Sequence, residues 1–492
     1  MIPTPSLVVS AGVLRPALAA LAKVVKKGPA VPEPLRHLKV ETVNRTTLRF
    51  TASDGEIFFS IDLPAEVGEN IEAFLVPLDR LQTQLRGARA QDAIPVRPGK
   101  APSASAYPES PRFRSTPIEL DPFAVTVLRQ ALACSSTDPT RHILQGAFLD
   151  PLGKEGVRIV GTDGRLLFRS RPLPITGLRE GLVLPALPVL ECPLLREQGP
   201  WRLHLPGPRE KECPGVFRLD GRSWSLTGRR IEGSYPSYGQ VIPRESEVKV
   251  RLNLPEILRD PLLHLLERLP GRDLQNRPLG IRMDREGVSL LARETTEDDY
   301  EQVRMPQTEW SGENLTMFVN RDYLARALRC GMTRFEFIDE ISPVRCQGET
   351  GLMIVMPVRA VGEVRIGDSR VLTLPEGRHL PPPRRVARPS PEGPGPAGPE
   401  PTRPVPTVIP VPVKPPSRKR EPRTRPESEA APPPLATAAE AVTEIQSALK
   451  AARSKLSQLT AFLRLSRRQQ RETEREVRTA RKALRTLRPV EP

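Results

Sequence analysis

Histidine, cysteine and acidic residues are the side chains with which the chain could hold a metal or perform catalysis. The histidines are His37, His142, His204, His264 and His379. They are dispersed, and the chain has no HExxH, GxSxG or Walker-type motif. The acidic run ETTEDDYE (residues 294–301) could bind a cation, but its polar composition favours the solvated face of a hairpin. The sequence therefore predicts no catalytic residue, no metal site and no cofactor.

The cysteines indicate a reducing compartment. They are Cys134, Cys192, Cys213, Cys330 and Cys346. An odd number without a CxxC pair is typical of free thiols rather than of a disulfide framework or a zinc site. The apolar positions near the N-terminus are interrupted by Ser10, Arg15 and Pro16, and no apolar run approaches 18 residues. We therefore expect a soluble cytoplasmic protein without a signal peptide or a membrane span.

The positive charge of the chain is concentrated in its last quarter. The chain of 492 residues has a formal net charge of +16, and residues 371–492 contain 24 basic and 12 acidic residues. Residues 1–370 hold the other 50 basic and 46 acidic residues, so they are nearly balanced. A basic tail is compatible with a nucleic-acid or acidic partner, and equally with solvated disorder.

Two short stretches with the same pattern point to a repeat. TASDGEIFFS (residues 51–60) and VGTDGRLLFRS (residues 160–170) each place Asp-Gly between two apolar runs. Asp accepts hydrogen bonds from its own downstream backbone, and Gly tolerates positive φ, so each stretch predicts a strand, a tight turn and a second strand.

Longer similarities extend this repeat to three copies. LRPAL (residues 14–18) recurs as LRQAL (128–132) and LRDPL (258–262), each in a stretch with helical apolar spacing. A second helix is predicted to begin near Pro77, Pro185 and Asn320, and strand-like alternation separates the helices. The sequence thus predicts three similar α+β domains, at residues 1–116, 117–247 and 248–370.

Three segments depart from this repeat. Residues 87–115 are rich in Pro, Ser and Ala where strands should follow, so the second half of the first domain is predicted to be shortened or irregular. Residues 371–435 form a Pro-rich basic linker, with 20 prolines between positions 381 and 434, and are expected to be extended or disordered. Residues 436–488 show heptad spacing of a long coiled-coil-like helix, which either self-associates, the favoured reading, or awaits an unknown partner.

Three motifs in this order resemble one family. They are VGTDGRLL (160–167), LTGRRIEGSYPSYGQVIP (226–243) and LMIVMPVR (352–359). With the threefold repeat they resemble the bacterial sliding clamp, the beta subunit of DNA polymerase III, over about residues 5–365; the linker and the C-terminal helix lie outside this resemblance. The resemblance implies two three-domain chains closing head to tail into a ring, with helices on the inner face, sheets outside and duplex DNA through the centre.

The resemblance also implies a non-catalytic processivity factor in DNA replication. A pocket between domains 2 and 3 would take short linear peptides from DNA polymerase and from the clamp loader, because apolar walls with Arg at the rim suit an extended peptide. The residues carried over are Leu144, Thr162, Gly164, Arg165, Leu167, Pro236, Val241, Ile341, Pro343, Val355, Met356, Pro357, Val358 and Arg359. A buried sheet core is the simpler explanation of these residues without the resemblance.

Contact with DNA in a ring needs only cations that face the phosphates. The candidates on the expected inner helices are Arg15, Lys23, Lys26, Lys27, Arg80, Arg86, Arg129, Arg259, Arg268 and Arg326. In the family, ring closure of the homodimer pairs an edge strand of domain 1 with domain 3 of the neighbour, and residues 87–115 stand where that strand is expected. The alternative is therefore a diverged clamp paralogue that acts as a protein-interaction scaffold without ring closure on DNA.

Overall fold

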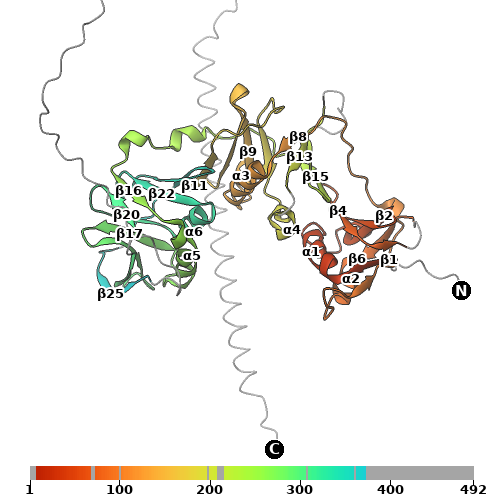
Figure 1. Cartoon of the computed structure of the whole chain (residues 1–492), viewed down its shortest axis with the longest axis horizontal. Helices are drawn as coiled ribbons and strands as arrows, with labels where there is room; N and C mark the ends of the chain where they lie inside the picture. The colour runs from red at the N-terminus through yellow and green to blue at the C-terminus, as the bar shows by residue number, and fades with distance from the viewer. Residues whose placement is uncertain are drawn as a thin grey trace, which may run out of the picture. The chain divides into compact units, whose positions relative to one another are not determined.

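The computed structural model describes residues 7–67, 72–98, 101–196, 199–207, 215–305, 308–359 and 362–372. They belong to one compact unit, residues 1–389. Apart from residues 371 and 372, the predicted linker and C-terminal helix lie outside the described residues. The described chain repeats one unit, a strand, a helical segment and further strands, which we number I to VI in chain order (Figure 1). The predicted α+β repeat is confirmed.

Units I to III occupy the first part of the chain. Unit I comprises β1 (Leu7–Ser10), α1 (Ala11–Leu21), β2 (His37–Asn44), β3 (Thr47–Ser53), β4 (Phe58–Pro64) and the short β5 (Glu66–Val67). Unit II comprises β6 (Phe74–Pro77), α2 (Leu78–Gln84) and β7 (Ala93–Pro95). Unit III comprises β8 (Ile118–Leu120), α3 (Pro122–Ala133), β9 (Gly146–Pro151), β10 (Val157–Thr162) and β11 (Leu166–Ser170). Unit II thus has fewer strands than its neighbours among the described residues.

Units IV to VI and one further strand complete the fold. Unit IV comprises β12 (Leu182–Pro185), α4 (Pro193–Arg196), β13 (Trp201–His204), β14 (Val216–Asp220) and β15 (Trp224–Arg229). Unit V comprises β16 (Val250–Asn253), α5 (Arg259–Arg268), β17 (Pro278–Asp284), β18 (Gly287–Ala292), β19 (Tyr300–Met305) and the short β20 (Glu309–Ser311). Unit VI comprises β21 (Leu315–Asn320), α6 (Arg321–Arg329), β22 (Met332–Phe337), β23 (Val344–Gly348) and β24 (Gly351–Val355), and β25 (Ile366–Val371) follows.

Single 3-10 turns connect several of these elements. They are Glu33–Arg36, Ala104–Ala106, His142–Leu144, Gly153–Glu155, Pro188–Glu191, Tyr238–Val241, Glu245–Glu247 and Glu256–Leu258. The last of these leads directly into α5.

The sheets run across the boundaries between the predicted domains. One sheet has the order β6-β2-β3-β4-β15-β14-β13-β8, and a second has the order β12-β9-β10-β11-β24-β23-β22-β16-β20. The first therefore joins strands of units I and IV and also includes β6 of unit II and β8 of unit III. The second joins strands of units III and VI and also includes β12 of unit IV and β16 and β20 of unit V. The two smaller sheets, β5-β1-β7 and β21-β17-β18-β19-β25, contain what remains of the first and third domains. Backbone hydrogen bonds thus join the domains directly.

The helices pack on one side of these sheets. Helix α3 contacts β9 and β10, α1 contacts β4, and α5 contacts α6, and Figure 1 shows them along the same side of the strands. The close approach of α3 explains a glycine in the VGTDG motif, because a Cβ atom at Gly161 would lie 1.9 Å from the carbonyl oxygen of Ala131 on α3. Any larger residue at position 161 would force α3 away from β10.

The two Asp-Gly corners have the same hydrogen bonds, as their sequences predict. Oδ1 of Asp54 accepts from the backbone N–H groups of Glu56 and Ile57, at 3.1 and 2.8 Å. Oδ1 of Asp163 accepts from the N–H groups of Arg165 and Leu166, both at 2.8 Å. The glycine after each aspartate has φ of +99° and +88° respectively, a region that side chains with a Cβ avoid. The repeated corner is therefore a feature of the repeated unit.

The predicted second helix of domain 2 is the main correction to the secondary structure. Pro185 ends strand β12, and the helical segment behind it is broken into a 3-10 turn and the four-residue α4, which begin at Pro188 and Pro193. Proline has no N–H group to donate, so closely spaced prolines interrupt a continuous helix. A cleft of about 850 Å³ opens beside this segment, lined among others by His142, Arg230 and Arg326.

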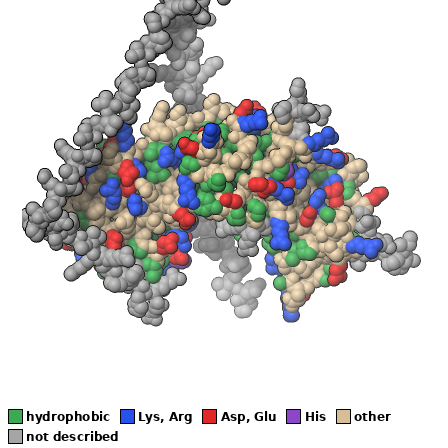
Figure 2. All heavy atoms as spheres, turned by 45° about the horizontal axis from the view of Figure 1, so that its top comes forward, with side chains coloured by type: hydrophobic (Ala, Val, Ile, Leu, Met, Phe, Trp, Pro, Cys, Tyr) green, Lys and Arg blue, Asp and Glu red, His purple; other side chains and the backbone are tan. Residues whose placement is uncertain are grey.

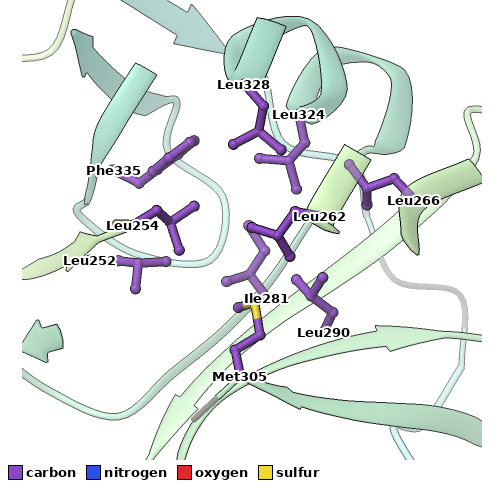
Figure 3. Close-up of a pocket in the computed structure, with 10 residues that line it drawn as sticks. All are labelled: Leu252, Leu254, Leu262, Leu266, Ile281, Leu290, Met305, Leu324, Leu328 and Phe335. Atoms are coloured by element: carbon purple, nitrogen blue, oxygen red, sulfur yellow. The ribbon is translucent and has the colours of Figure 1, made fainter. Parts of the chain in front are cut away.

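The core of domain 3 is filled almost completely. Leucines from α5 and α6 meet Ile281, Leu290 and Met305 of the sheet below them (Figure 3). The space left between them is only about 10 Å³ and its lining is entirely apolar, so it offers no polar partner for a water molecule. This packing makes α5 and α6 a rigid support for the strands that they cover.

Candidate peptide-binding surface

The carried-over residues gather mainly where β11 of unit III meets β24 of unit VI. Leu166 and Leu167 are paired with Val355 and Ile354 across this antiparallel junction. The pairing continues beyond β24, because the N–H group of Met356 donates to the carbonyl oxygen of Arg165 at 2.9 Å. The TDG corner and the VMPV segment, which are about 190 residues apart in the sequence, therefore share one sheet.

Exposure divides the carried-over residues into three groups. Thr162, Leu167 and Val355 are buried; Leu144, Pro343, Pro357 and Val358 are half-buried; Gly164, Arg165, Pro236, Val241, Ile341, Met356 and Arg359 are exposed. The buried members support the sheet, and the exposed ones are available to a partner. Leu144 lies in the 3-10 turn before β9, and its backbone hydrogen bonds are to Arg141 and Ser136 nearby.

Exposed large apolar side chains are few in the described chain, and most of them belong to this set. Val241, Ile341 and Met356 are 53%, 76% and 41% exposed. The two others among the described residues are Val43 and Val371, at 44% and 54%. Single exposed apolar side chains scattered over a surface are normal, whereas three large ones drawn from a single predicted site favour a binding surface over ordinary core. We call Val241, Ile341 and Met356 the apolar triad.

The segment that carries Val241 is held on the outer side of the same sheet. Tyr235, Tyr238 and Ile242 pack on a small apolar cluster that includes Leu167 and Ile354. The ring of Tyr235 is stacked on Phe148 of β9 with the centroids 4.7 Å apart, and the hydroxyl of Tyr238 donates to Asp150. Burial and the hydrogen bond to Asp150 raise the pKa of Tyr238, so its hydroxyl keeps its proton.

A buried ion pair fixes the end of this segment. Nη1 of Arg345 donates to the carbonyl oxygen of Pro243 at 2.9 Å, and Nε of Arg345 lies 3.2 Å from Glu336. The Glu336 side chain is completely buried and also accepts from Gln347 at 2.9 Å. Arg345 thus connects the sheet to the backbone two residues after Val241.

The rim contains residues that the sequence did not single out. Tyr323 of α6 lies beside Asp163. Burial of the Tyr323 hydroxyl and, to a lesser extent, the negative charge of Asp163 raise the pKa of Tyr323 to about 12. Arg165 donates to Oδ1 of Asn276 at 3.1 Å, and Arg141 donates to the carbonyl oxygen of Asp163 at 2.6 Å. Nothing in the sequence around Tyr323, three residues after the Asn320 cap, indicates that it belongs to the site. Only the packing of α6 against the TDG corner brings Tyr323 to the rim.

The candidate DNA-facing cations divide by what they already contact. Arg15 donates to the carbonyl oxygens of Leu85 and Ala88, and Arg80 donates to that of Pro98. Ion pairs are formed by Lys26 with Asp54 (2.8 Å), Lys27 with Asp79 (2.7 Å) and Arg259 with Asp260 (3.6 Å). Arg129 lies 3.5 Å from the carbonyl oxygen of Glu191, and Arg326 lines the cleft beside α4.

Three candidates keep an unpaired charge in the described part of the chain. The side chains of Lys23, Arg86 and Arg268 are exposed and make no hydrogen bond or ion pair with any other described residue. Elsewhere the two signs of charge are interspersed, as Figure 2 shows for one face. These three side chains, which we call the free cations, are therefore available to an external partner.

The side chains that could do other chemistry are not assembled for it in the described residues. Cys134, Cys192, Cys330 and Cys346 are buried free thiols, and burial raises the pKa of the Cys346 thiol. The described residues contain no group of three or more His, Cys, Asp or Glu side chains that could hold a metal. Over the same residues, no helix is long and apolar enough to cross a membrane.

Repeated α/β units whose sheets continue from one unit into another define the DNA-clamp class of fold. The beta subunit from DNA polymerase of Streptococcus pyogenes superposes with a TM-score of 0.58 at 17% identity, over 72% of this chain and 100% of that one. The DNA polymerase III beta subunit of Borrelia burgdorferi gives 0.58 at 13% identity, over 73% of this chain and 99% of the other. These structures establish the fold.

The sequence comparison agrees with the fold. The chain is 29% identical to the beta sliding clamp of Synechococcus elongatus over 241 residues, 46% of this chain and 60% of that protein. It is 26% identical to the beta sliding clamp of Synechocystis over 332 residues, 63% of this chain and 78% of that protein. The match to the first of these relatives thus spans less than two thirds of its length. No protein-family model matches the chain. The resemblance to the bacterial sliding clamps is confirmed.

Proposed function

We propose that the chain is a non-catalytic DNA sliding clamp of the cytoplasm. Two copies would form a ring around duplex DNA, and the apolar triad would bind short peptides of a DNA polymerase and of the protein that loads the ring. The observation that carries this proposal is the exposure of all three side chains of the apolar triad, one of which, Met356, directly follows β24 where that strand pairs with β11. The fold that presents them covers the solved DNA polymerase beta subunit of Streptococcus pyogenes over its entire length. The sequence similarity to the beta sliding clamps of Synechococcus elongatus and Synechocystis supports the clamp rather than the scaffold alternative.

An extended peptide fits the chemistry of this surface. Val241, Ile341 and Met356 offer apolar side chains that are already exposed, so a peptide gains contact without prior opening of the core. Arg165 and Arg359 at the rim are exposed and can pair with carboxylates of the peptide. Pro236, Pro343 and Pro357 restrict the backbone around the surface, which limits the ordering entropy lost on binding.

Binding to DNA is proposed to rest on charge alone. Lys23 follows α1, Arg86 follows α2 and Arg268 ends α5, so all three free cations lie at the C-terminal ends of helices. Contacts of this kind carry no sequence information and weaken as salt rises, because binding releases the counterions of the phosphates.

The combined substitution Lys23→Glu, Arg86→Glu and Arg268→Glu tests this contact. The slope of log affinity against log salt for a random duplex is expected to fall in magnitude by about 2 to 3, since each lost phosphate contact removes about 0.9. The matched control replaces three exposed arginines in strand–strand turns, Arg45, Arg222 and Arg285, by glutamate. Fluorescence anisotropy at several salt concentrations measures both slopes, and equal slopes for the two triple variants would exclude the proposed contact.

A further inference from the structure

The sheets that join different domains follow one rule. β4, the last long strand of unit I, pairs with β15, the last strand of unit IV, in antiparallel register. β11, the last strand of unit III, pairs with β24, the last strand of unit VI, in the same way. Each junction therefore joins the last strands of two units that are three apart along the chain.

The same rule assigns a partner to β19, which is the last long strand of unit V. The chain ends with unit VI, so counting three units on from unit V passes unit VI and unit I of a second copy and reaches unit II of that copy. The partner of β19 would therefore be the last strand of unit II in the second copy. That unit lacks the strands that correspond to β14 and β15, because the described residues between β7 and β8 contain only the 3-10 turn Ala104–Ala106. β7 itself has three residues and ends at Pro95, which cannot donate to a ladder.

Strand β25 occupies the vacant position on β19. Its register pairs Tyr300 with Ile366 and Arg304 with Val371, and the pairing is parallel, whereas every other named strand pair in the described residues is antiparallel. The N–H group of Tyr300 donates to the carbonyl oxygen of Arg365 at 2.8 Å, and that of Leu372 donates to the carbonyl oxygen of Arg304 at 2.9 Å. The chain thus closes this edge with its own strand.

The side chains of β25 contribute little to holding it there. Every residue of the strand after Ile366 is exposed. Ile366 and Val364 pack partly against a small cluster formed by Leu291, Tyr300 and Phe318. The ion pair between Arg370 and Glu301 measures 2.6 Å, but its side chains are 53% and 28% exposed, and such pairs add little stability. A strand with few buried apolar contacts opens more readily than the core strands beside it.

We propose that β25 is a displaceable cover of the β19 edge, and that a second copy of the chain can pair with β19 only after β25 has left. The inference rests on the ring dimer of the proposed function. It adds that this dimer forms only when β25 has left the edge of β19. In the free chain β25 should stay paired with β19. The strand β25 belongs to the same chain and has six residues, whereas β7 has three residues and would have to come from a second copy.

A disulfide lock tests the cover directly. Arg304 and Val371 are register partners and both are exposed, so Arg304→Cys/Val371→Cys can fix β25 to β19 in the oxidised protein. Residues 1–389 form a compact unit, so this segment and the full chain are studied side by side. Oxidation is expected to weaken self-association of residues 1–389 at least tenfold, and dithiothreitol should restore it, as measured by sedimentation equilibrium.

A second variant acts in the opposite direction. Ile366→Asp/Arg370→Glu removes the apolar contact and reverses the ion pair, and should raise self-association about fivefold or more. The two single-cysteine variants, oxidised in parallel, control for native thiols. Equal association of the locked and reduced proteins would overturn the proposal, and so would a weakened β25 that leaves association unchanged. Failure of the full chain to stay on DNA in every redox state would instead contradict the proposed function.

Discussion

Replacing Ile341 and Met356 together by aspartate is expected to weaken binding of a clamp-binding peptide by about 100-fold. Burial of each side chain against an apolar partner should contribute about 1.5 kcal/mol or more, and tenfold in affinity corresponds to about 1.4 kcal/mol. Both side chains are exposed in the free chain, at 76% and 41%, so the change should leave the fold intact. Fluorescence anisotropy with a labelled peptide from the clamp-binding segment of a bacterial DNA polymerase measures the loss.

The matched control for this variant is Val43→Asp. Val43 is 44% exposed and lies on β2, outside the candidate surface. It makes the same chemical change to an exposed apolar residue, so the peptide should bind this variant as it binds the unchanged chain. The contrary result is that Val43→Asp lowers the peptide affinity as much as the double variant does. The loss would then come from added negative charge in general, and the apolar triad would not be the binding surface.

Replacing Glu336 by glutamine is expected to lower the free energy of unfolding by about 3 kcal/mol. The side chain is fully buried and lies 3.2 Å from Arg345, so the nearly isosteric amide leaves the guanidinium inside the protein without its partner charge. Because Arg345 also donates to Pro243, the segment carrying Val241 should loosen and peptide affinity should fall as well. Urea unfolding of the full chain measures the first effect.

An exposed ion pair provides the comparison. Arg304 and Glu286 are 2.8 Å apart, with side chains 45% and 62% exposed, so Glu286→Gln should change the free energy of unfolding by less than about 1 kcal/mol. Similar losses for Glu286→Gln and Glu336→Gln would show that burial does not determine the contribution of the pair. If Glu336→Gln left the peptide affinity unchanged, the ion pair between Glu336 and Arg345 would not be needed to hold the candidate binding surface in place.

Local signals in the sequence predicted local structure well. The two Asp-Gly corners have the turn hydrogen bonds that their residue types favour, and Asn320 caps α6 by accepting from the N–H group of Asp322. These features depend on neighbours within three residues, so a single stretch contains all the information. The predicted start of the second helix of domain 2 at Pro185 was wrong, because a proline suits the first turn of a helix but equally the end of a strand, and the further prolines at 188 and 193 break the segment that follows.

Features that depend on distant partners could not be read in this way. β25 has the sequence IGDSRV, which lacks the alternation of a half-buried strand, and only the free edge of β19 makes it a strand. The hydrogen bond from Arg345 to Pro243 and the position of Tyr323 beside Asp163 likewise depend on residues far apart in the chain. Several predicted DNA-facing cations, such as Arg15 and Lys26, contact the protein itself, which helical position alone does not reveal.

Retention on blocked DNA tests the central claim, a closed ring around the duplex, most directly. A linear duplex is fixed to a bead at one end, the full chain is allowed to thread over the free end, and streptavidin then closes that end. High salt removes proteins that are held by charge, but it cannot remove a closed ring. We predict that the chain stays on the blocked duplex through the wash and is released when a restriction enzyme cuts the DNA. Loss of the chain during the wash, with both ends blocked, would contradict the clamp.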